Sequence, residues 1–319
     1  MTFTQLRYFV AVVECGFNVS KAALLLHTSQ PGISRQIRVL EQSIGTHLLV
    51  RTNGRIIGLT EAGSKTFSTA KRVLKDVTSL KSMSEEYLQE EVGHLVIGTM
   101  HTHALGILPS AVAMLRKRYP GVTIEVRQAS PVMITELCKI GELDIGLSLG
   151  QPEAQHRLLG FPLVSIPRVL IVQKNHPLLK KRNISLEDLL NYPMICQHSL
   201  SAGGWEVTRV FKEMGKELSP AIYAMDSSVI KAFVEKDAGI AVISGASFDP
   251  KRDTAIRAID VSKLFQPSQL TAVIDPYRFL RGYTYDLITE IAPQWTKRKI
   301  DLTIREAISN LEMPLPATL

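Results

Sequence analysis

The sequence predicts a mixed α/β protein that consists of a small helical module with a β-hairpin, one long helix and a larger two-lobed α/β domain. Three observations predict this fold class. Short helical periodicities separated by capping residues occupy the first sixty positions. A run without Pro, and with Gly only at position 63, extends from Glu61 to Glu91. Strand and helix patterns alternate from residue 93 onward, and 319 residues suffice for two or three such domains.

Positive charge is concentrated near the N-terminus. The chain has a net charge of +7. Residues 1–75 contain ten Lys and Arg against three acidic residues, so the rest of the chain is neutral. Such a basic segment attracts phosphate groups through counterion release and steering. Taken alone, the charge fits a merely solvated basic face equally well.

The first two predicted helices are short. Residues 4–15 place apolar side chains at i, i+3, i+4 and i+7 on one face. Gly16 ends this helix, and Asn18 is a suitable N-cap for a second helix that runs to about Leu26. A tight turn then leads into a third helix.

The third helix has the properties of a DNA-reading element. Ser29 can cap it, Pro31 suits its first turn and Gly45 ends it. One face is apolar, whereas the other carries residue types that bind base edges and phosphates: Gln30, Ser34, Arg35 and Arg38. Two short helices with a tight turn and a polar second helix predict a helix-turn-helix.

A β-hairpin follows at residues 48–60. Two apolar runs flank Asn53-Gly54, the dipeptide that most strongly favours a two-residue hairpin turn. Arg51 and Arg55 bracket this turn, so we expect the hairpin to lie as a wing against the DNA backbone. The N-terminal module is therefore predicted to be a winged helix-turn-helix.

The long helix begins at Glu61, after Thr60 as its cap. It has an apolar stripe formed by Phe67, Ala70, Val73, Leu74, Val77 and Leu80. An isolated amphipathic helix must bury its stripe, and a twin helix would bury it well. We therefore expect a homodimer; packing onto the chain's own C-terminal domain is the alternative.

The C-terminal part alternates strands and helices in two series. The first has strands at residues 94–99, 122–129 and 143–149, with helices to Tyr119 and from Ser130. The second has strands at 169–172, 194–196, 222–225 and 240–244, with helices from Ser185, after Gly203 and from Ser227. This alternation predicts largely parallel sheets in two lobes. Crossing segments lie near 162–167 and 266–270, and a strand at 270–274 with a helix at 279–291 returns to the first lobe.

The predicted boundaries follow from these patterns. The DNA-binding domain spans 1–60 and the linker and dimerisation helix 61–91. The effector-binding domain spans 92–319, with lobe I at about 92–163 and 269–319 and lobe II at about 164–268. Ligands in open α/β sheets bind beyond the carboxyl ends of strands, and several of these ends are Ser/Thr-rich helix starts that favour anions. We therefore expect a small anionic effector between the lobes.

Two segments closely resemble the DNA-binding motif of LysR-type regulators. One is the run AALLLHTSQPGISRQI from Ala22 to Ile37, and the other comprises Leu49-Val50-Arg51 with Leu59 to Gly63. The resemblance implies a two-lobed domain like that of periplasmic binding proteins and a dimer or tetramer on double-stranded promoter DNA. RNA polymerase is a further candidate partner. The DNA-binding residues predicted from the motif and the helix pattern are Asn18, Ser20, Lys21, Thr28, Ser29, Gln30, Pro31, Ser34, Arg35, Arg38, Arg51 and Arg55.

Within that family the chain resembles the CysB/Cbl branch, which regulates sulfur assimilation. The matching segments are NVS at 18–20, TSQPGIS at 28–34, HT at 101–102, RYP at 118–120, FLRGYTYD at 279–286 and AP at 292–293. The resemblance implies an activator of sulfur or organosulfur genes. A LysR-type regulator of an unrelated pathway, or a repressor that needs no effector, is the alternative.

The chain departs from that branch at its ligand contacts. The branch has Thr-Thr-His-Thr-Gln where this sequence has TMHTH at 99–103, so only Thr102 keeps a contact residue. Leu149 and Ala202 stand where the branch has contact threonines, with Ser201 as a substitute. Because hydroxyl donors are lost and apolar side chains gained, we expect an organosulfur compound instead of sulfate. The predicted effector-binding residues are Met100, Thr102, His103, Ser130, Leu149, Ser201, Ala202 and Ser227.

Other classes of protein fit the sequence less well. His101 and His103 could be metal ligands, but no third ligand has suitable spacing and no catalytic motif is present, so we predict no enzyme activity, metal or cofactor. A secreted solute-binding protein does not account for the basic N-terminal module. Three widely spaced cysteines, and an N-terminus unlike a signal peptide, predict a cytoplasmic protein without membrane segments.

Overall fold

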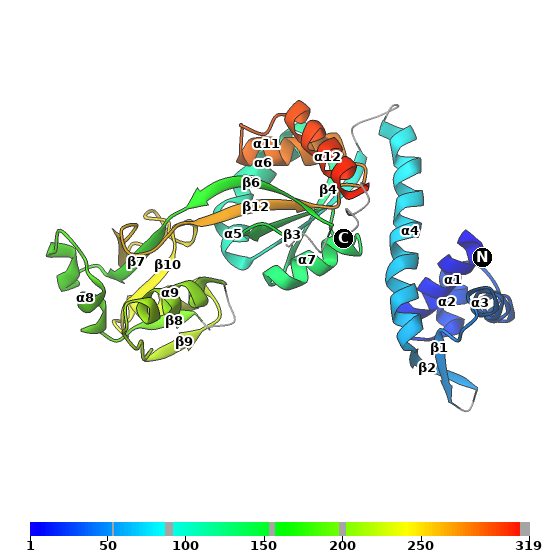
Figure 1. Cartoon of the computed structure of the whole chain (residues 1–319), viewed down its shortest axis with the longest axis horizontal. Helices are drawn as coiled ribbons and strands as arrows, with labels where there is room; N and C mark the ends of the chain where they lie inside the picture. The colour runs from blue at the N-terminus through cyan, green and yellow to red at the C-terminus, as the bar shows by residue number, and fades with distance from the viewer. Residues whose placement is uncertain (53, 87–91, 153–156, 198–201, 313–319) are drawn as a thin grey trace, which may run out of the picture. The chain divides into compact units, whose positions relative to one another are not determined.

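The computed structural model describes the chain except residues 53, 87–91, 153–156, 198–201 and 313–319. It comprises two compact units, Met1–Gln89 and Glu90–Leu319. No helix in the described part of the chain is both long and apolar enough to cross a membrane. Figure 1 shows a first unit of helices with one two-stranded hairpin and a second unit that contains the other sheets.

The first unit has the predicted helices and wing. Its elements are α1 (Phe3–Glu14), α2 (Val19–Leu25), α3 (Gln30–Ile44), β1 (Leu49–Thr52), β2 (Arg55–Leu59) and α4 (Glu61–Glu86). The side chain of Asn18 accepts a hydrogen bond from the Lys21 N–H at 2.9 Å, and that of Ser29 accepts one from the Gly32 N–H at 3.2 Å. Gly45 ends α3 in the left-handed conformation, with φ of 81°. The predicted caps of α2 and α3 are therefore confirmed.

The apolar stripe of α4 begins inside this unit. The rings of Phe9 on α1 and Phe67 on α4 meet edge to face, with centroids 6.3 Å apart. Ala70 is buried in the same core, and Val73 and Leu74 pack against it. This part of the stripe therefore packs partly within its own unit, and its contact with a twin helix stays a prediction. The predicted continuation of the helix to Glu91 lies partly outside the described residues.

The junction between wing and long helix is very tightly packed. The Thr60 hydroxyl donates to the His47 carbonyl at 2.8 Å and accepts from the Gly63 N–H at 2.9 Å, so Thr60 caps α4 as predicted. A Cβ atom on Gly63 would lie 1.9 Å from the carbonyl oxygen of Leu48. Only glycine allows the two backbones to approach this closely.

Lobe I of the second unit is a five-stranded mixed sheet in the order β4-β3-β5-β12-β6. Its strands are β3 (Val92–Thr99), β4 (Gly121–Gln128), β5 (Ile145–Leu149), β6 (Leu159–Ile166) and β12 (Ser268–Ile274). The first three are parallel as predicted, whereas β12 runs antiparallel to β5 and β6. The predicted crossing segment near 162–167 is largely strand β6, which pairs with the returning strand β12.

Helices cover both faces of this sheet. They are α5 (His101–Gly106), α6 (Leu108–Arg118), α7 (Pro131–Lys139), α11 (Gly282–Ile291) and α12 (Lys297–Glu312). Leu95 and Ile97 join the core under α6 and α11, and the intervening Val96 joins the core under α7, as the period-two alternation of a strand requires. The sequence predicted one helix up to Tyr119. The structure has two helices, α5 and α6, separated at Ile107, and a proline lies in the first turn of α6.

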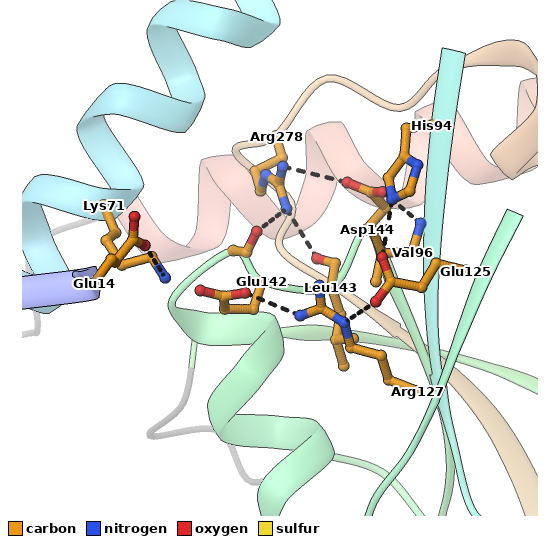
Figure 2. A network of polar contacts seen from close by, with 11 residues as sticks. Glu14, Lys71, His94, Val96, Glu125, Arg127, Glu142, Leu143, Asp144 and Arg278 are labelled. Atoms are coloured by element: carbon orange, nitrogen blue, oxygen red, sulfur yellow. Dashed lines mark hydrogen bonds and ion pairs between the residues drawn. The ribbon is translucent and has the colours of Figure 1, made fainter. Parts of the chain in front are cut away.

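A polar network fixes one end of the lobe I sheet, as Figure 2 shows. The nearly buried Arg278 donates to the carbonyl oxygens of Gly141 and Leu143 and pairs with Asp144 at 3.4 Å. Asp144 also accepts the N–H of Val96 at 2.8 Å. These bonds anchor the loop that enters β5, so this charged cluster holds the fold together.

Lobe II is built around an antiparallel sheet, β10-β7-β11, and a parallel pair, β8 with β9. The strands are β7 (Arg168–Gln173), β8 (Ile195–Gln197), β9 (Ile222–Ala224), β10 (Ala241–Ser244) and β11 (Ile256–Asp260). The helices are η2 (Pro177–Lys180), α8 (Leu186–Leu190), α9 (Ala202–Glu213), α10 (Ser227–Glu235) and η3 (Gly245–Ser247). In Figure 1, β6 and β12 lead side by side from the lobe I sheet toward lobe II. The prediction of largely parallel sheets was wrong for β7, whose sheet partners are antiparallel.

Candidate functional site

The polar face of α3 is exposed, and its apolar face forms the core of the first unit. Ile33, Ile37 and Leu40 are fully buried, which fixes the rotation of the helix. That rotation leaves the side chains of the opposite face accessible to a ligand: Gln30, Pro31, Arg35 and Arg38 are exposed and Ser34 is half-buried. The N-terminal end of α3 therefore presents amide, hydroxyl and guanidinium groups together, as base recognition requires.

The other predicted DNA contacts from the two helices lie at helix starts. Ser20 and Lys21 are exposed in the first turn of α2. Asn18 and Ser29 are exposed as well, although their side-chain oxygens already cap α2 and α3. Thr28 is half-buried directly before the Ser29 cap. Free N–H groups at such helix starts are suited to phosphate oxygens.

The two wing arginines differ in their contacts within the protein. Arg55 is exposed. Arg51 forms a two-bonded ion pair with Glu41, from Nη1 to Oε1 at 3.1 Å and from Nη2 to Oε2 at 3.0 Å. The structure therefore gives Arg51 the role of joining the wing to α3, a role that the sequence prediction of a DNA contact did not include.

Glu41 is the buried centre of that junction, with 5% exposure. It also accepts the N–H groups of Leu48 and Leu49, at 2.9 and 3.2 Å. Burial by itself would raise the pKa of Glu41, but the hydrogen bonds from Arg51 and from these two N–H groups outweigh it and lower the pKa. The carboxylate therefore orients the wing relative to α3.

In the second unit, a cavity of about 250 Å³ lies between the lobes. Five predicted effector residues line it, all from lobe I: Met100, Thr102, His103, Ser130 and Leu149. They come from the carboxyl ends of β3, β4 and β5, where α/β sheets bind ligands. Lobe II contributes residues outside the list of predicted effector-binding residues: Arg168, Gln197, Met225, Asp226 and Ser244.

Of the three remaining predicted effector residues, only Ser227 has a described side chain, and it is not part of the described lining. Ser201 lies outside the described residues, and Ala202 begins α9 without a described side chain. Ser227 is buried, and its hydroxyl lies 3.4 Å from the amide nitrogen of Gln197. Asp226, not a hydroxyl residue, caps α10. A carboxylate therefore occupies the helix start that we had expected to favour anions.

Arg168 is the most informative residue that the sequence analysis missed. It begins β7 and has 4% exposure. Its Nη2 donates to the Ser268 hydroxyl at 3.1 Å, whereas its Nε has no hydrogen-bond partner among the described residues. Burial lowers the pKa of Arg168, with the charge of Glu206 acting in the opposite direction. A charged residue at the start of the apolar run RVLIV was the available signal.

Two further buried polar groups of the lining are unpartnered among the described residues. They are Nδ1 of His103, a residue with 1% exposure, and the hydroxyl of Ser244. Burial lowers the pKa of His103 to about 4, so its imidazole is neutral at physiological pH. Leaving such groups unpaired costs free energy unless a ligand satisfies them.

His101 connects the lobes across the cavity. Its Nδ1 lies 3.1 Å from Gln128 Oε1 in lobe I. Its Nε2 lies 3.1 Å from Asp226 Oδ2 and 3.2 Å from the Ser228 hydroxyl, both in lobe II. Within the described residues no group of three or more His, Cys, Asp or Glu is arranged to hold a metal ion. His101 therefore acts here as a contact between lobes.

Comparisons with known proteins match both units. The model of the bacterial regulatory helix-turn-helix protein, lysR family, matches residues 3–64, and that of the LysR substrate binding domain matches residues 88–295. The chain is similar to two HTH-type transcriptional regulators from Burkholderia cenocepacia, SsuR and CysB. Identity to SsuR is 33% over 97% of this chain and all of the relative. Identity to CysB is 30% over 98% of this chain and all of the relative. A crystal structure of the cofactor-binding domain of the Cbl transcriptional regulator matches with a TM-score of 0.63 and 25% identity, covering 67% of this chain and 94% of that domain.

Proposed function

The chain belongs to the LysR family and is a transcriptional regulator with an effector-binding domain, and from this premise we propose that it activates genes of sulfur or organosulfur metabolism in response to a small anion with an apolar part. Similarity to the regulators SsuR and CysB over nearly the whole chain supports the choice of pathway. The chemistry of the cavity supports the class of effector.

DNA recognition rests on α3 in this proposal. Gln30, Ser34 and Arg35 contact base edges in a major groove, and Arg38 and Arg55 contact phosphates. The exposure of this face, opposite three fully buried residues of the same helix, is the supporting observation. Ser20, Lys21 and Thr28 add phosphate contacts from the start of α2 and from the turn.

The effector binds between the lobes in this proposal. The observation that carries it is a buried arginine, Arg168, in the lining of the cavity with no carboxylate within ion-pair distance among the described residues. A buried cation is costly unless an anion compensates it. Met100, Leu149 and Met225 supply an apolar wall, which suits an effector larger and less polar than an inorganic ion.

The proposal assigns three parts to the chain: residues 1–60 bind DNA, 61–91 join subunits and 92–319 sense the effector. The active form is a cytoplasmic homodimer or homotetramer on promoter DNA, with RNA polymerase as a candidate partner. In this proposal the subunits join through α4, whose stripe residues Phe67, Val73 and Leu74 are only partly buried in the core of their own unit.

Genome-wide mapping of bound DNA tests the proposal. Cells are grown with sulfate or with alkanesulfonates as sulfur source, and an Arg35→Ala variant serves as the control for specific binding. We expect bound sites upstream of sulfur-uptake genes and transcription that changes with the sulfur source. Sites near unrelated genes would indicate another pathway, and occupancy and transcription that respond to no sulfur source would indicate a repressor that needs no effector.

A further inference from the structure

Few of the charged groups that line the cavity are available to a ligand. Arg168 is buried and forms no ion pair among the described residues; the nearby charge of Glu206 acts on it, but that carboxylate is itself paired with Arg209 at 2.7 Å. His103 is neutral because it is buried. Asp226 is already engaged, since its carboxylate caps α10 and pairs with His101. The described lining therefore offers one positive charge, Arg168, that no lining carboxylate pairs with.

From this distribution, and on the basis of the proposed function, we infer that the effector is a singly charged oxyanion with an apolar tail, whose head group is bound by Arg168. A carboxylate or a sulfonate has this chemistry. One negative charge balances one buried cation, and its oxygens can accept from the guanidinium group of Arg168, which lines the cavity.

A doubly charged ion fits this cavity poorly. Its second charge would be desolvated without a counter-charge, in a lining that also contains the carboxylate of Asp226. The cavity of about 250 Å³ has room for roughly eight water-sized volumes of about 30 Å³ each, more than a single tetrahedral ion fills. The extra room is walled by Met100, Leu149 and Met225, against which an alkyl chain can pack.

The test is calorimetric titration of the full chain with a series that varies charge at constant tail length. The probes are butanesulfonate and pentanoate as monoanions, butyl phosphate at pH 8 as a dianion, butanesulfonamide as a neutral analogue, and inorganic sulfate. We expect at least one monoanion to bind about tenfold or more tightly than the phosphate ester, the sulfonamide and sulfate, because only a monoanion matches the single positive charge of Arg168. The better of the two monoanions identifies the head group.

Two results would overturn the inference: a dianion or the neutral probe that binds as tightly as the better monoanion, or failure of both monoanions to bind at millimolar concentration. The titration uses no DNA, so its failure is distinguishable from failure of the proposed function. A neutral compound that binds and changes transcription would refute the charge assignment and leave the regulator in place.

Variants locate the head group. Arg168→Met removes the charge at similar size and should weaken monoanion binding about tenfold or more while leaving sulfonamide binding nearly unchanged. Arg168→Lys, which keeps the charge, should recover part of the affinity and remains informative if the methionine variant does not fold. Arg257→Met is the matched control, because Arg257 is exposed on β11, which pairs with β7 in the same sheet. Equal losses in the Arg168 and Arg257 methionine variants would contradict the assignment.

Discussion

His101 and Asp226 meet across the cavity, with Nε2 of the histidine 3.1 Å from Oδ2 of the aspartate. His101 is the first residue of α5, directly beyond the end of β3 in lobe I, and Asp226 is the cap of α10 in lobe II. Both line the cavity. A ligand that enters between the lobes therefore lies beside a contact that holds them together.

Removing this contact should loosen the lobes with little effect on folding. His101→Ala deletes a partly exposed pair, which contributes about 1 kcal/mol or less, so effector affinity should fall up to about fivefold. Amide hydrogen exchange should increase at the start of α10. His94→Ala is the matched control, because His94 pairs with Glu125 inside lobe I. Equal exchange rates at α10 in both variants would exclude the connecting role.

Gly63→Ala should strongly destabilise the N-terminal unit. The new Cβ would lie 1.9 Å from the Leu48 carbonyl oxygen, and because that atom belongs to the backbone it cannot rotate away. We expect a loss of about 3 kcal/mol in the free energy of unfolding, measured by denaturant titration. Gly58→Ala is the control, because its Cβ would meet nothing within 4 Å, and it should change stability by less than about 1 kcal/mol.

Gln30→Ala and Arg35→Ala should separate base recognition from affinity. Each should cost about 1–3 kcal/mol in operator binding, and Gln30→Ala should relax preference at a single base pair. Gel shifts over a set of altered operators measure both effects. Arg72→Ala, an exposed arginine on α4, is the control for charge alone. Unchanged affinity in both α3 variants would refute the groove assignment.

The effector-binding domain should lose stability as the pH falls from about 6.5 to 4. The pKa of His103 is about 4 in the fold and 6.5 as its ordinary value, so the unfolded chain binds a proton first. The loss should approach about 3 kcal/mol below that window. His103→Gln should flatten the dependence in thermal melts of the full chain across this range. His27→Asn, at an exposed position whose left-handed backbone asparagine also adopts, should leave it unchanged.

A second pH effect should appear in more acidic solution, in the N-terminal unit. The pKa of Glu41 is lowered on folding, so its contribution is complete above its ordinary value of 4.5 and is lost as the pH falls through the folded pKa. Glu41→Gln should cost about 1–3 kcal/mol at neutral pH and weaken this acid dependence. Glu61→Gln, on an exposed pair with Lys65, should have little effect. Acid titrations of both variants, followed by circular dichroism, measure this difference. Equal acid dependence in the two variants would contradict the role of Glu41.

Local chemistry explains which elements were predictable. Asn18, Ser29 and Thr60 bind N–H groups three residues further along, so their sequence neighbours suffice to predict the caps. The cavity residues of lobe I could be predicted because they follow buried parallel strands. The position of Arg168 in the cavity lining could not be predicted from its sequence neighbours, since Arg168 is held by Ser268, a residue from the returning strand β12. The pairing of Arg51 with Glu41 likewise follows from how the wing folds back, which charge pattern alone does not reveal.

The edge-to-face contact between Phe9 and Phe67 has a mechanical consequence. It fastens α4 to the same core that sets the rotation of α3. At about 1.5 Å per residue, α4 is roughly 39 Å long over its 26 residues. In the proposed dimer on DNA, a rotation of α4 would therefore be expected to move Gln30 and Arg35 with it.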